Sequence, residues 1–484
     1  MRNSAREPAV EDVRRWLALL ALSLGGLVTT ADMTIVGVAL ASIRSDMHFS
    51  EASAIWVVNG YMATYGGLLL LSGRLADLFG QRRFLLLGIF LFTFASLGCG
   101  LAMSKELLVA ARCLQGVGGA IVSVMALALT SNLFTDASKR VKALGIFAFT
   151  CTSGGSIGLL LGGVLTSVLG WRWIFLINIP AGACLYALCA ALVPRDAGRS
   201  SDDAGPLDIA GAVTLIVSLM FALYAIVTGN ELGWTSPPTL TLLAVAFLLT
   251  VLFIAIEARV QVPLIPRRLL RIRNLAVANI VGMLFSVAVQ AWIFISALYL
   301  QFVLNFSAME TSFTILPASV LRAVTSLTVS PMLITRFGAR PPLFVGMLTA
   351  AVGLALLGRA PVNAKVALDV IPGLLILGLG IGMAYNCLLL SALDAVSPSD
   401  SGIVSGIVHT SFTLGGALGL SFLAGVAASR TNDLLTAEAG PPFALTSGYH
   451  AAFWVAAALA SLAAVIGGVF LRSARRDINR LALT

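Results

Sequence analysis

Long apolar runs alternate with short polar segments along this 484-residue chain, a pattern that predicts an all-α polytopic membrane protein. A helix that crosses the hydrocarbon core of a bilayer needs about 20 mainly apolar residues. The runs close to that length predict fourteen transmembrane helices, near residues 16–40, 53–72, 84–103, 107–129, 141–165, 173–193, 207–228, 238–258, 275–302, 311–334, 342–358, 367–391, 403–427 and 451–471.

The basic residues indicate how these helices are oriented. Most of the 31 lysines and arginines fall in every second polar segment, whereas Arg112 and Arg322 lie deep inside predicted spans. Short loops rich in Lys and Arg stay on the cytoplasmic side of a membrane, so both termini are expected to be cytoplasmic. The first run is long enough to span and carries an acidic residue late within it, which favours a retained helix over a cleaved signal.

Composition excludes several classes of protein. Hydrophobic residues make up 58% of the chain and charged residues 11%, whereas soluble domains carry about 25% charged residues. The net charge of +9 is spread over short clusters and forms no single patch, so a nucleic-acid partner is not expected. The sequence has no phosphate-binding G-x-x-x-x-G-K-[ST] loop and no catalytic or metal-ligand constellation. We therefore expect neither an enzyme nor a cofactor, and an ion gradient as the energy source.

A polar motif occurs twice. GRLADLFGQRR starts at Gly73, and a degraded copy, SPMLITRFGAR, ends at Arg340. Aligning their Phe-Gly pairs also matches Arg82 with Arg340 and Gly88 with Gly346. Each copy would lie between the second and third helices of a six-helix bundle. Parallel six-helix halves with a substrate cavity between them are a transporter architecture. The predicted parts are a cytoplasmic N-terminus (1–15), an N-terminal bundle (16–193), a linker with two additional helices (194–274), a C-terminal bundle (275–471) and a cytoplasmic tail (472–484).

The first copy of the motif also predicts a charged latch at the membrane surface. Its two glycines suit a tight turn, and its carboxylate could pair with an arginine or with the N-terminus of a neighbouring helix. A turn that is merely solvated is the alternative. The predicted latch residues are Gly73, Arg74, Asp77, Gly80, Arg82 and Arg83.

Several motifs in order resemble one known family. Besides the loop motif, the chain contains ADMTIVGVAL from Ala31, WVVNGY from Trp56, RCLQGVGGA from Arg112 and WRWIFLINIP from Trp171. In this respect it is similar to the fourteen-helix branch of the drug/proton antiporters in the major facilitator superfamily. The resemblance implies two six-helix bundles with two inserted central helices. It further implies proton-coupled export of amphipathic or aromatic small molecules across the cell inner membrane by alternating access.

The fifth predicted helix departs from the antiporter pattern. That pattern is a glycine ladder containing Gly-Pro, but Leu159 stands where the proline is expected, which removes an expected kink. The glycines still permit close approach between helices. The residues that match this motif are Gly154, Gly158, Gly162 and Gly163.

Charged and polar residues within the spans are candidates for coupling. Asp32 lies deep in the first helix, where a carboxylate usually faces a cavity or a partner, and it could bind a cation or exchange protons. A static ion pair is the structural alternative. The resemblance implies a role in proton coupling for Arg112, with Gln115 one turn later; snorkelling to the outer interface is the alternative for Arg112.

Arg322 has no counterpart in these motifs and is predicted near mid-membrane, where a guanidinium cannot escape by losing its proton. It could pair with Asp32, contact an anionic group on the substrate, or lie at the lipid interface. Other polar and aromatic residues could line a cavity, although hydrogen bonds and packing between helices explain most such residues. These are Asn59, Tyr61, Gln290, Trp292, Phe294, Tyr385, Asn386 and His409.

The sequence therefore predicts a secondary active transporter, a monomer in the lipid bilayer, whose partners are protons and a small molecule. A facilitator or symporter that uses Arg322 to bind an anionic metabolite is the alternative within the same architecture. A non-transporting membrane sensor would need an appended soluble domain, and the polar segments of this sequence are too short for one.

Overall fold

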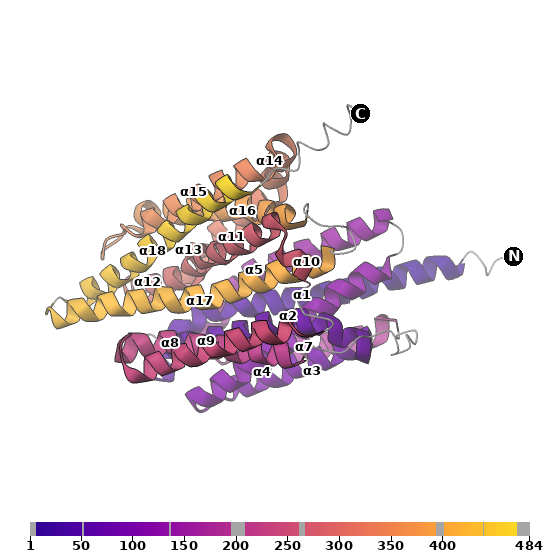
Figure 1. The fold of residues 1–484 in the computed structure, drawn as a ribbon, viewed down its shortest axis with the longest axis horizontal. Coiled ribbons are helices and arrows are strands. Elements are labelled where there is room, and N and C mark those ends of the chain that lie inside the picture. The colour runs from indigo at the N-terminus through magenta and orange to yellow at the C-terminus, as the bar shows by residue number, and fades with distance from the viewer. Residues whose placement is uncertain are drawn as a thin grey trace.

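The computed structural model is helical throughout the residues that it describes, which are 6–50, 53–134, 137–194, 209–260, 267–393, 401–438 and 440–471. Figure 1 shows the helices running roughly along one direction, with both chain termini at the same end. The first helices are α1 (Arg6–Asp46), α2 (Trp56–Phe79), α3 (Gln81–Gly100), α4 (Lys105–Leu133), α5 (Ala137–Val168), α6 (Trp173–Leu176) and α7 (Asn178–Leu192), preceded at α2 by the 3-10 turn η1 (Ser53–Ile55).

The later helices include three π-helical turns, of which η3 and η4 join neighbouring α-helices without a loop and η5 directly precedes α16. They are α8 (Ile209–Leu232), α9 (Pro237–Glu257), α10 (Arg267–Leu270), α11 (Arg273–Gln290), η3 (Ala291–Ile295), α12 (Ser296–Phe302), α13 (Ala308–Val324), η4 (Thr325–Val329), α14 (Ser330–Phe337), α15 (Arg340–Leu357), η5 (Val366–Val370), α16 (Ile371–Leu393), α17 (Ser401–Thr436) and α18 (Pro441–Phe470).

Twelve helices in the described ranges are long and apolar enough to cross a membrane. The crossings predicted for the other two runs, at α2 and α8, stay predictions. Several helices extend beyond their apolar runs: α1 begins at Arg6, α17 continues to Thr436 and α18 begins at Pro441. The predicted ends were wrong there because polar residues continue a helix past the lipid, and Pro441 occupies a first-turn position that suits proline.

The packing of the helices repeats along the chain. In the first group, α1 packs on α5, α3 on α4, α2 on α4 and α3 on α7. In the second group, the equivalent pairs are α11 on α17, α15 on α16, α13 on α16 and α15 on α18. We call α1 to α7 the N-terminal group and α11 to α18 the C-terminal group. The repeated motif in the sequence thus corresponds to a repeated arrangement of helices.

The two Phe-Gly motifs have matching local structures. Gly80 ends α2 with φ of 83° and Gly338 ends α14 with φ of 79°, a conformation that glycine adopts without steric cost. Arg82 donates to the carbonyl of Ala190 near the end of α7, and its counterpart Arg340 donates to a carbonyl near the end of α18. A cation at the C-terminal end of a helix is favourable, so both arginines stabilise the sixth long helix of their group.

The two groups meet near the end of the bundle that lies opposite the termini. Gln301 of α12 donates to the carbonyl of Val38 at 2.9 Å, and the backbone NH of Met309 in α13 donates to Ser167 of α5 at 3.0 Å. Asn59 near the start of α2 donates to Ser421 of α17 at 2.5 Å. The structure is therefore closed at the end away from the termini.

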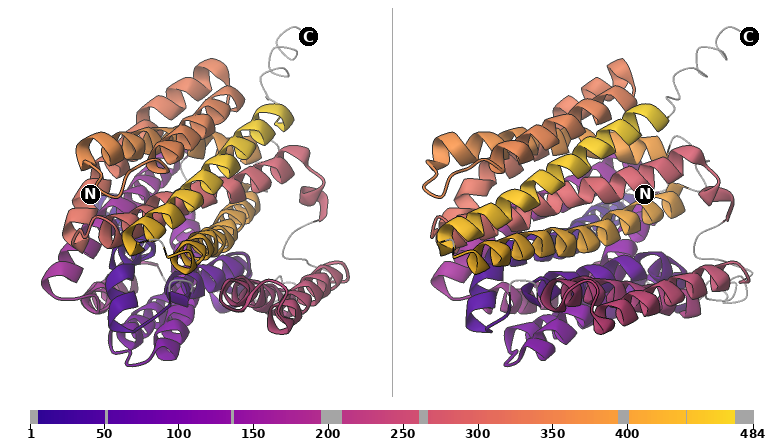
Figure 2. Two further views of the ribbon diagram at one scale, coloured as in Figure 1. Left: turned by 90° about the vertical axis from the view of Figure 1, so that its left-hand side faces the viewer. Right: turned by 60° about the vertical axis from the view of Figure 1, so that its left-hand side comes forward.

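The α8–α9 hairpin packs at the seam between the two groups. Helix α8 contacts both α2 and α17, whereas α9 packs mainly on α8. Figure 2 shows the hairpin on one side of the molecule. The residue nearest to Gly67 of α2 is Ile216 of α8, where a Cβ would lie 2.4 Å from its side chain. The hairpin thus bridges the two groups along this seam.

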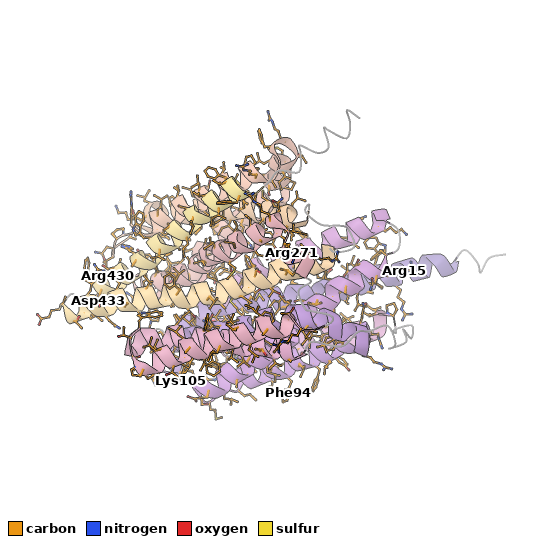
Figure 3. The ribbon with its side chains drawn as sticks, viewed as in Figure 1. Arg15, Phe94, Lys105, Arg271, Arg430 and Asp433 are labelled. Atoms are coloured by element: carbon orange, nitrogen blue, oxygen red, sulfur yellow. The ribbon has the colours of Figure 1, made fainter. Side chains whose placement is uncertain are left out.

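The outer surface of the bundle suits lipid. Large apolar side chains face outwards, among them Phe94, Phe247 and Leu248, which are 58%, 68% and 64% exposed. Figure 3 shows Phe94 on the outside, away from the helix contacts. In the same view the labelled charges Arg15 and Lys105 lie towards opposite ends of the molecule. An apolar surface between charged ends is what a bilayer requires.

Candidate functional site

A buried carboxylate lies at the centre of the N-terminal group. Asp32 belongs to α1, well inside the span Val13–Asp46, and is 2% exposed. Arg112 of α4 donates its Nη1 to Oδ2 of Asp32 at 2.6 Å. Gln115 of α4 and Asn178 at the start of α7 donate to Oδ1 at 2.8 and 2.9 Å. The interior charge is therefore both paired and hydrogen-bonded, as burial requires.

The arginine of this pair is held from several directions. Its Nε donates to the backbone carbonyl of Val57 at 2.8 Å, and its Nη1 also donates to Gln115 Oε1 at 2.7 Å. The guanidinium lies 4.4 Å from the ring centroid of Tyr61 and 5.6 Å from that of Phe175. The alternative of snorkelling is wrong in this conformation, because Arg112 is 1% exposed. Removing one partner of such a buried pair typically costs about 3–5 kcal/mol.

Two members of this network were not identified from the sequence. Asn178 lies within the motif WRWIFLINIP, between the short α6 and α7, and its amide reaches Asp32. Ser96 of α3 accepts from Gln115 Nε2 at 2.8 Å and donates to the carbonyl of Phe92. A polar residue inside a quoted motif was an available signal for Asn178. Ser96 lies in an apolar stretch of α3 and in none of the quoted motifs, so the sequence did not single it out.

The glycine ladder of α5 brings α1 close to it. A Cβ at Gly154, Gly158 or Gly162 would lie 2.7, 2.3 or 2.6 Å from a backbone carbonyl of α1. Only glycine permits this approach. Gly163 faces the other group instead, where a Cβ would lie 2.3 Å from Ser312 Oγ of α13. The ladder therefore positions the helix that carries Asp32 and also the contact between the two groups.

Leu159 replaces the expected proline without interrupting α5, which is a single helix from Ala137 to Val168. The Leu159 side chain is 3% exposed, and its carbonyl accepts a hydrogen bond from Ser312 at 2.7 Å. The residue thus joins the contact between α5 and α13.

Arg322 is separate from the Asp32 network. The predicted pair between Arg322 and Asp32 is wrong in this conformation, because Arg112, Gln115 and Asn178 bind the carboxylate. Arg322 lies in α13 and faces α5, where a Cβ at Gly155 would be 3.4 Å from its Nη2. The alternative of a lipid-interface position is also wrong, since the residue is halfway along the span Ala308–Phe337.

Most of the predicted cavity residues are packed between helices. Asn59, Tyr61, Gln290, Trp292 and Phe294 are at most 6% exposed, so they line no open space in this conformation. In this conformation these aromatic and amide side chains fill contacts between helices, so their place in a cavity stays a prediction.

Three other predicted cavity residues keep some exposed surface. Tyr385 is 39% exposed, and Asn386 and His409 are partly exposed. Asn386 donates to the carbonyl of Ser326 at 2.6 Å, which fixes its amide within the C-terminal group. Tyr385 and His409 therefore remain available to contact a bound molecule.

The charged latch falls partly outside the residues described. The side chains of Arg74 and Asp77 are not among those that the structure describes, so their predicted pairing lies outside the described residues. Arg83 is exposed. In the described part of the chain no cluster of three His, Cys, Asp or Glu side chains could hold a metal ion.

A family model and several known proteins match most of this chain. The family model described as the Major Facilitator Superfamily matches residues 22–420. The chain is 35% identical over 468 residues to a puromycin resistance protein of Streptomyces alboniger, covering 96% of this chain and 92% of that protein. It is 34% identical over 426 residues to a lincomycin resistance protein of Streptomyces lincolnensis, covering 87% of this chain and 86% of that protein.

Solved structures share the fold at low sequence identity. A bacterial homologue of the human lysosomal transporter Spinster, in an inward-facing and unoccupied conformation, aligns with a TM-score of 0.68 and 16% identity, covering 96% of this chain and 98% of that one. A D-xylose-proton symporter aligns with a TM-score of 0.64 and 14% identity, covering 95% and 98%. At these identities the likeness concerns the fold alone.

Proposed function

The chain belongs to the Major Facilitator Superfamily, and we propose that it exports amphipathic or aromatic small molecules, antibiotics among them, across the bacterial inner membrane in exchange for protons. Relatives named for resistance to puromycin and lincomycin support export as the direction. The observation that carries the proton coupling is the buried Asp32–Arg112 pair. A carboxylate in this position can hold a proton and release it again when its partner moves.

The proposed topology places both termini in the cytoplasm and counts fourteen crossings, with α2 and α8 added to the twelve apolar helices. Residues 16–193 and 275–471 would form the two halves, and residues 194–274 the linker with α8 and α9. Because basic residues gather at the end with the termini, that end would be cytoplasmic. In this topology the end at which Gln301 contacts Val38 and Met309 contacts Ser167 would face outwards. A single chain contains both halves, so a monomer suffices.

The proposed mechanism uses the Asp32–Arg112 pair as a switch. An arginine beside a carboxylate favours its ionised form. A proton that reaches Asp32 removes the charge and weakens the bond to Arg112, which also bonds to Val57 near the start of α2. Because α2 contacts α17 of the other half, a change at Arg112 can alter the contact between the halves. Proton binding and conformation would thus be linked.

The segment around Asp77 is the proposed latch for the opposite conformation. It is the last turn of α2, just before Gly80 and α3, and lies at the cytoplasmic end in this topology. Pairing of Asp77 with arginines would hold the two halves together there when the outer end opens.

Cells provide the test of the proposed function. In a bacterial host that lacks its own drug exporters, expression of the chain should lower the accumulation of puromycin or lincomycin. The inhibitory concentration should rise at least about fourfold, because the rate of export then exceeds the rate of passive drug entry. Collapse of the proton gradient with an uncoupler should restore accumulation. The control is the Asp32→Asn variant at equal expression. Unchanged accumulation of both drugs, or exclusion that survives the uncoupler, would contradict the proposal.

A further inference from the structure

The most unusual group outside the Asp32 network is Arg322. We propose that Arg322 forms a subsite for an anionic group on an aromatic cargo, an inference that rests on the proposed export function and specifies its substrate class. The position supports this first. Arg322 lies halfway along a 30-residue span, at a depth where charged side chains usually mark a pathway or a binding site.

No counter-charge accompanies this arginine among the described side chains. Its Nε is buried without a hydrogen-bond partner, and no ion pair involves it. Asp32, the carboxylate in the membrane interior, is already bound by Arg112. The other described acidic side chains lie in or beside the end turns of their helices: Asp46, Glu106, Glu257, Glu310, Asp369, Asp433 and Glu438. The interior therefore has one unpaired charge in its described part, and that charge is positive.

Two aromatic side chains lie close to this cation. The guanidinium carbon lies 5.5 Å from the ring centroid of Trp292, and Tyr385 is near enough to interact with it electrostatically. The Tyr385 ring in turn lies 6.3 Å from that of Phe412, which stacks with His409 at 6.4 Å. Tyr385 and His409 keep exposed surface, so a planar ring could lie against them beside the arginine.

The facing helix α5 meets Arg322 at a glycine. Gly155 of α5 is opposite Arg322, and a Cβ there would already lie 3.4 Å from Nη2. The π-helical turn η3 contains Trp292, and η4 begins three residues after Arg322. Such turns are frequent at functional sites because they shift the side chains that follow. The helix that carries Arg322 and the helix that carries Trp292 thus each contain a π-helical turn next to the proposed subsite.

The chemistry of the group determines the ligand class. A guanidinium is planar, always charged and able to bind both oxygens of a carboxylate, and it stacks on aromatic rings. Beside this guanidinium a carboxylate is favoured over an ammonium group, so the amine of a basic drug would lie elsewhere in the cavity. The ligand that fits is an aromatic acid whose carboxylate meets Arg322 while its ring lies among Tyr385, Phe412 and His409.

Binding to the purified full chain in lipid nanodiscs, without any gradient, tests this inference. The probes are 1-naphthoate, its neutral analogue 1-naphthamide and the cation 1-naphthylmethylammonium, measured by calorimetry. The wild type should bind naphthoate at least about tenfold more tightly than naphthamide, because a charge-assisted pair contributes about that factor. The cation should bind least well.

Variants assign the preference to one residue. Arg322→Gln should reduce the ratio between naphthoate and naphthamide to about one, whereas Arg322→Lys should keep part of it. Arg359→Gln is the matched control, because Arg359 also lies over a tryptophan ring, at 5.7 Å, but near a helix end. If Arg322→Gln fails to fold, Gly155→Leu provides the test instead. Its side chain would crowd the guanidinium of Arg322, so the affinity for naphthoate should fall to that for naphthamide.

Several results would overturn the inference. These are absence of naphthoate binding to the wild type, equal binding of acid and amide, or a preference that persists in Arg322→Gln or, if that variant misfolds, in Gly155→Leu. The binding measurement is independent of transport. If cells that express the wild-type chain do not exclude the drugs, but the purified chain still prefers naphthoate to naphthamide through Arg322, only the proposed export function is contradicted.

Discussion

Asp32→Asn should abolish proton-coupled export, with a loss of at least about a hundredfold in drug-dependent proton movement. Asparagine cannot take up a proton. It also leaves Arg112 buried without its carboxylate, a change that typically costs about 3–5 kcal/mol. Each 1.4 kcal/mol corresponds to a factor of about ten in an equilibrium or rate constant. The measurement is the response of a pH-sensitive dye in everted membrane vesicles after drug addition, at matched amounts of folded protein.

Asp46→Asn is the control for this substitution. Asp46 pairs with Arg172 at 2.8 Å, but both side chains are close to half exposed. Such a surface pair contributes about 0–1 kcal/mol, so transport should change less than about fivefold. Full proton coupling in Asp32→Asn, or an equal loss in Asp46→Asn, would show that the buried pair has no special role.

Gly163→Leu should shift the protein towards the conformation that is open at the end away from the termini. A Cβ at this position would lie 2.3 Å from Ser312 Oγ and 2.7 Å from the Ala308 carbonyl, so α5 and α13 could not remain in contact. Overpacking of this kind costs about 1–3 kcal/mol, which changes the ratio of the two conformations by about 5- to 150-fold.

Spin labels report this shift directly. The exposed residues Met103 and Leu435 lie at that end, in the N-terminal and C-terminal groups respectively, and suit labelling in a variant without the six native cysteines. Pulsed electron resonance should give a longer distance between the labels in Gly163→Leu. Gly145→Leu is the matched control, because nothing lies within 4 Å of a Cβ there. An unchanged distance in Gly163→Leu would mean that this contact does not hold the end closed.

The sequence predicted those features of the fold that depend on local pattern. Apolar length identified the helices, and the repeated Phe-Gly motif anticipated two equivalent arrangements, down to Gly80 and Gly338 with the same backbone conformation. The ends of α1 and α18 were wrong because hydropathy marks where lipid ends, whereas capping and proline determine where a helix ends.

Contacts between distant residues were harder to predict. The motifs singled out Asp32, Arg112 and Gln115 one by one, and the structure brings them together. The position of Arg322 against α5 could not be read from one helix, since it depends on how the two groups are packed. The contact of Trp292 with Arg322 depends on tertiary packing in the same way.

The central claim is that a buried carboxylate exchanges its proton for cargo. It is tested most directly with the purified protein in liposomes that contain a pH-sensitive dye, under an imposed pH gradient and without other energy sources. On addition of the drug that cells exclude, the account predicts proton flow down the gradient together with drug movement in the opposite direction, and neither in Asp32→Asn. Drug movement without any proton flow, at the same rate with and without the gradient, would contradict it.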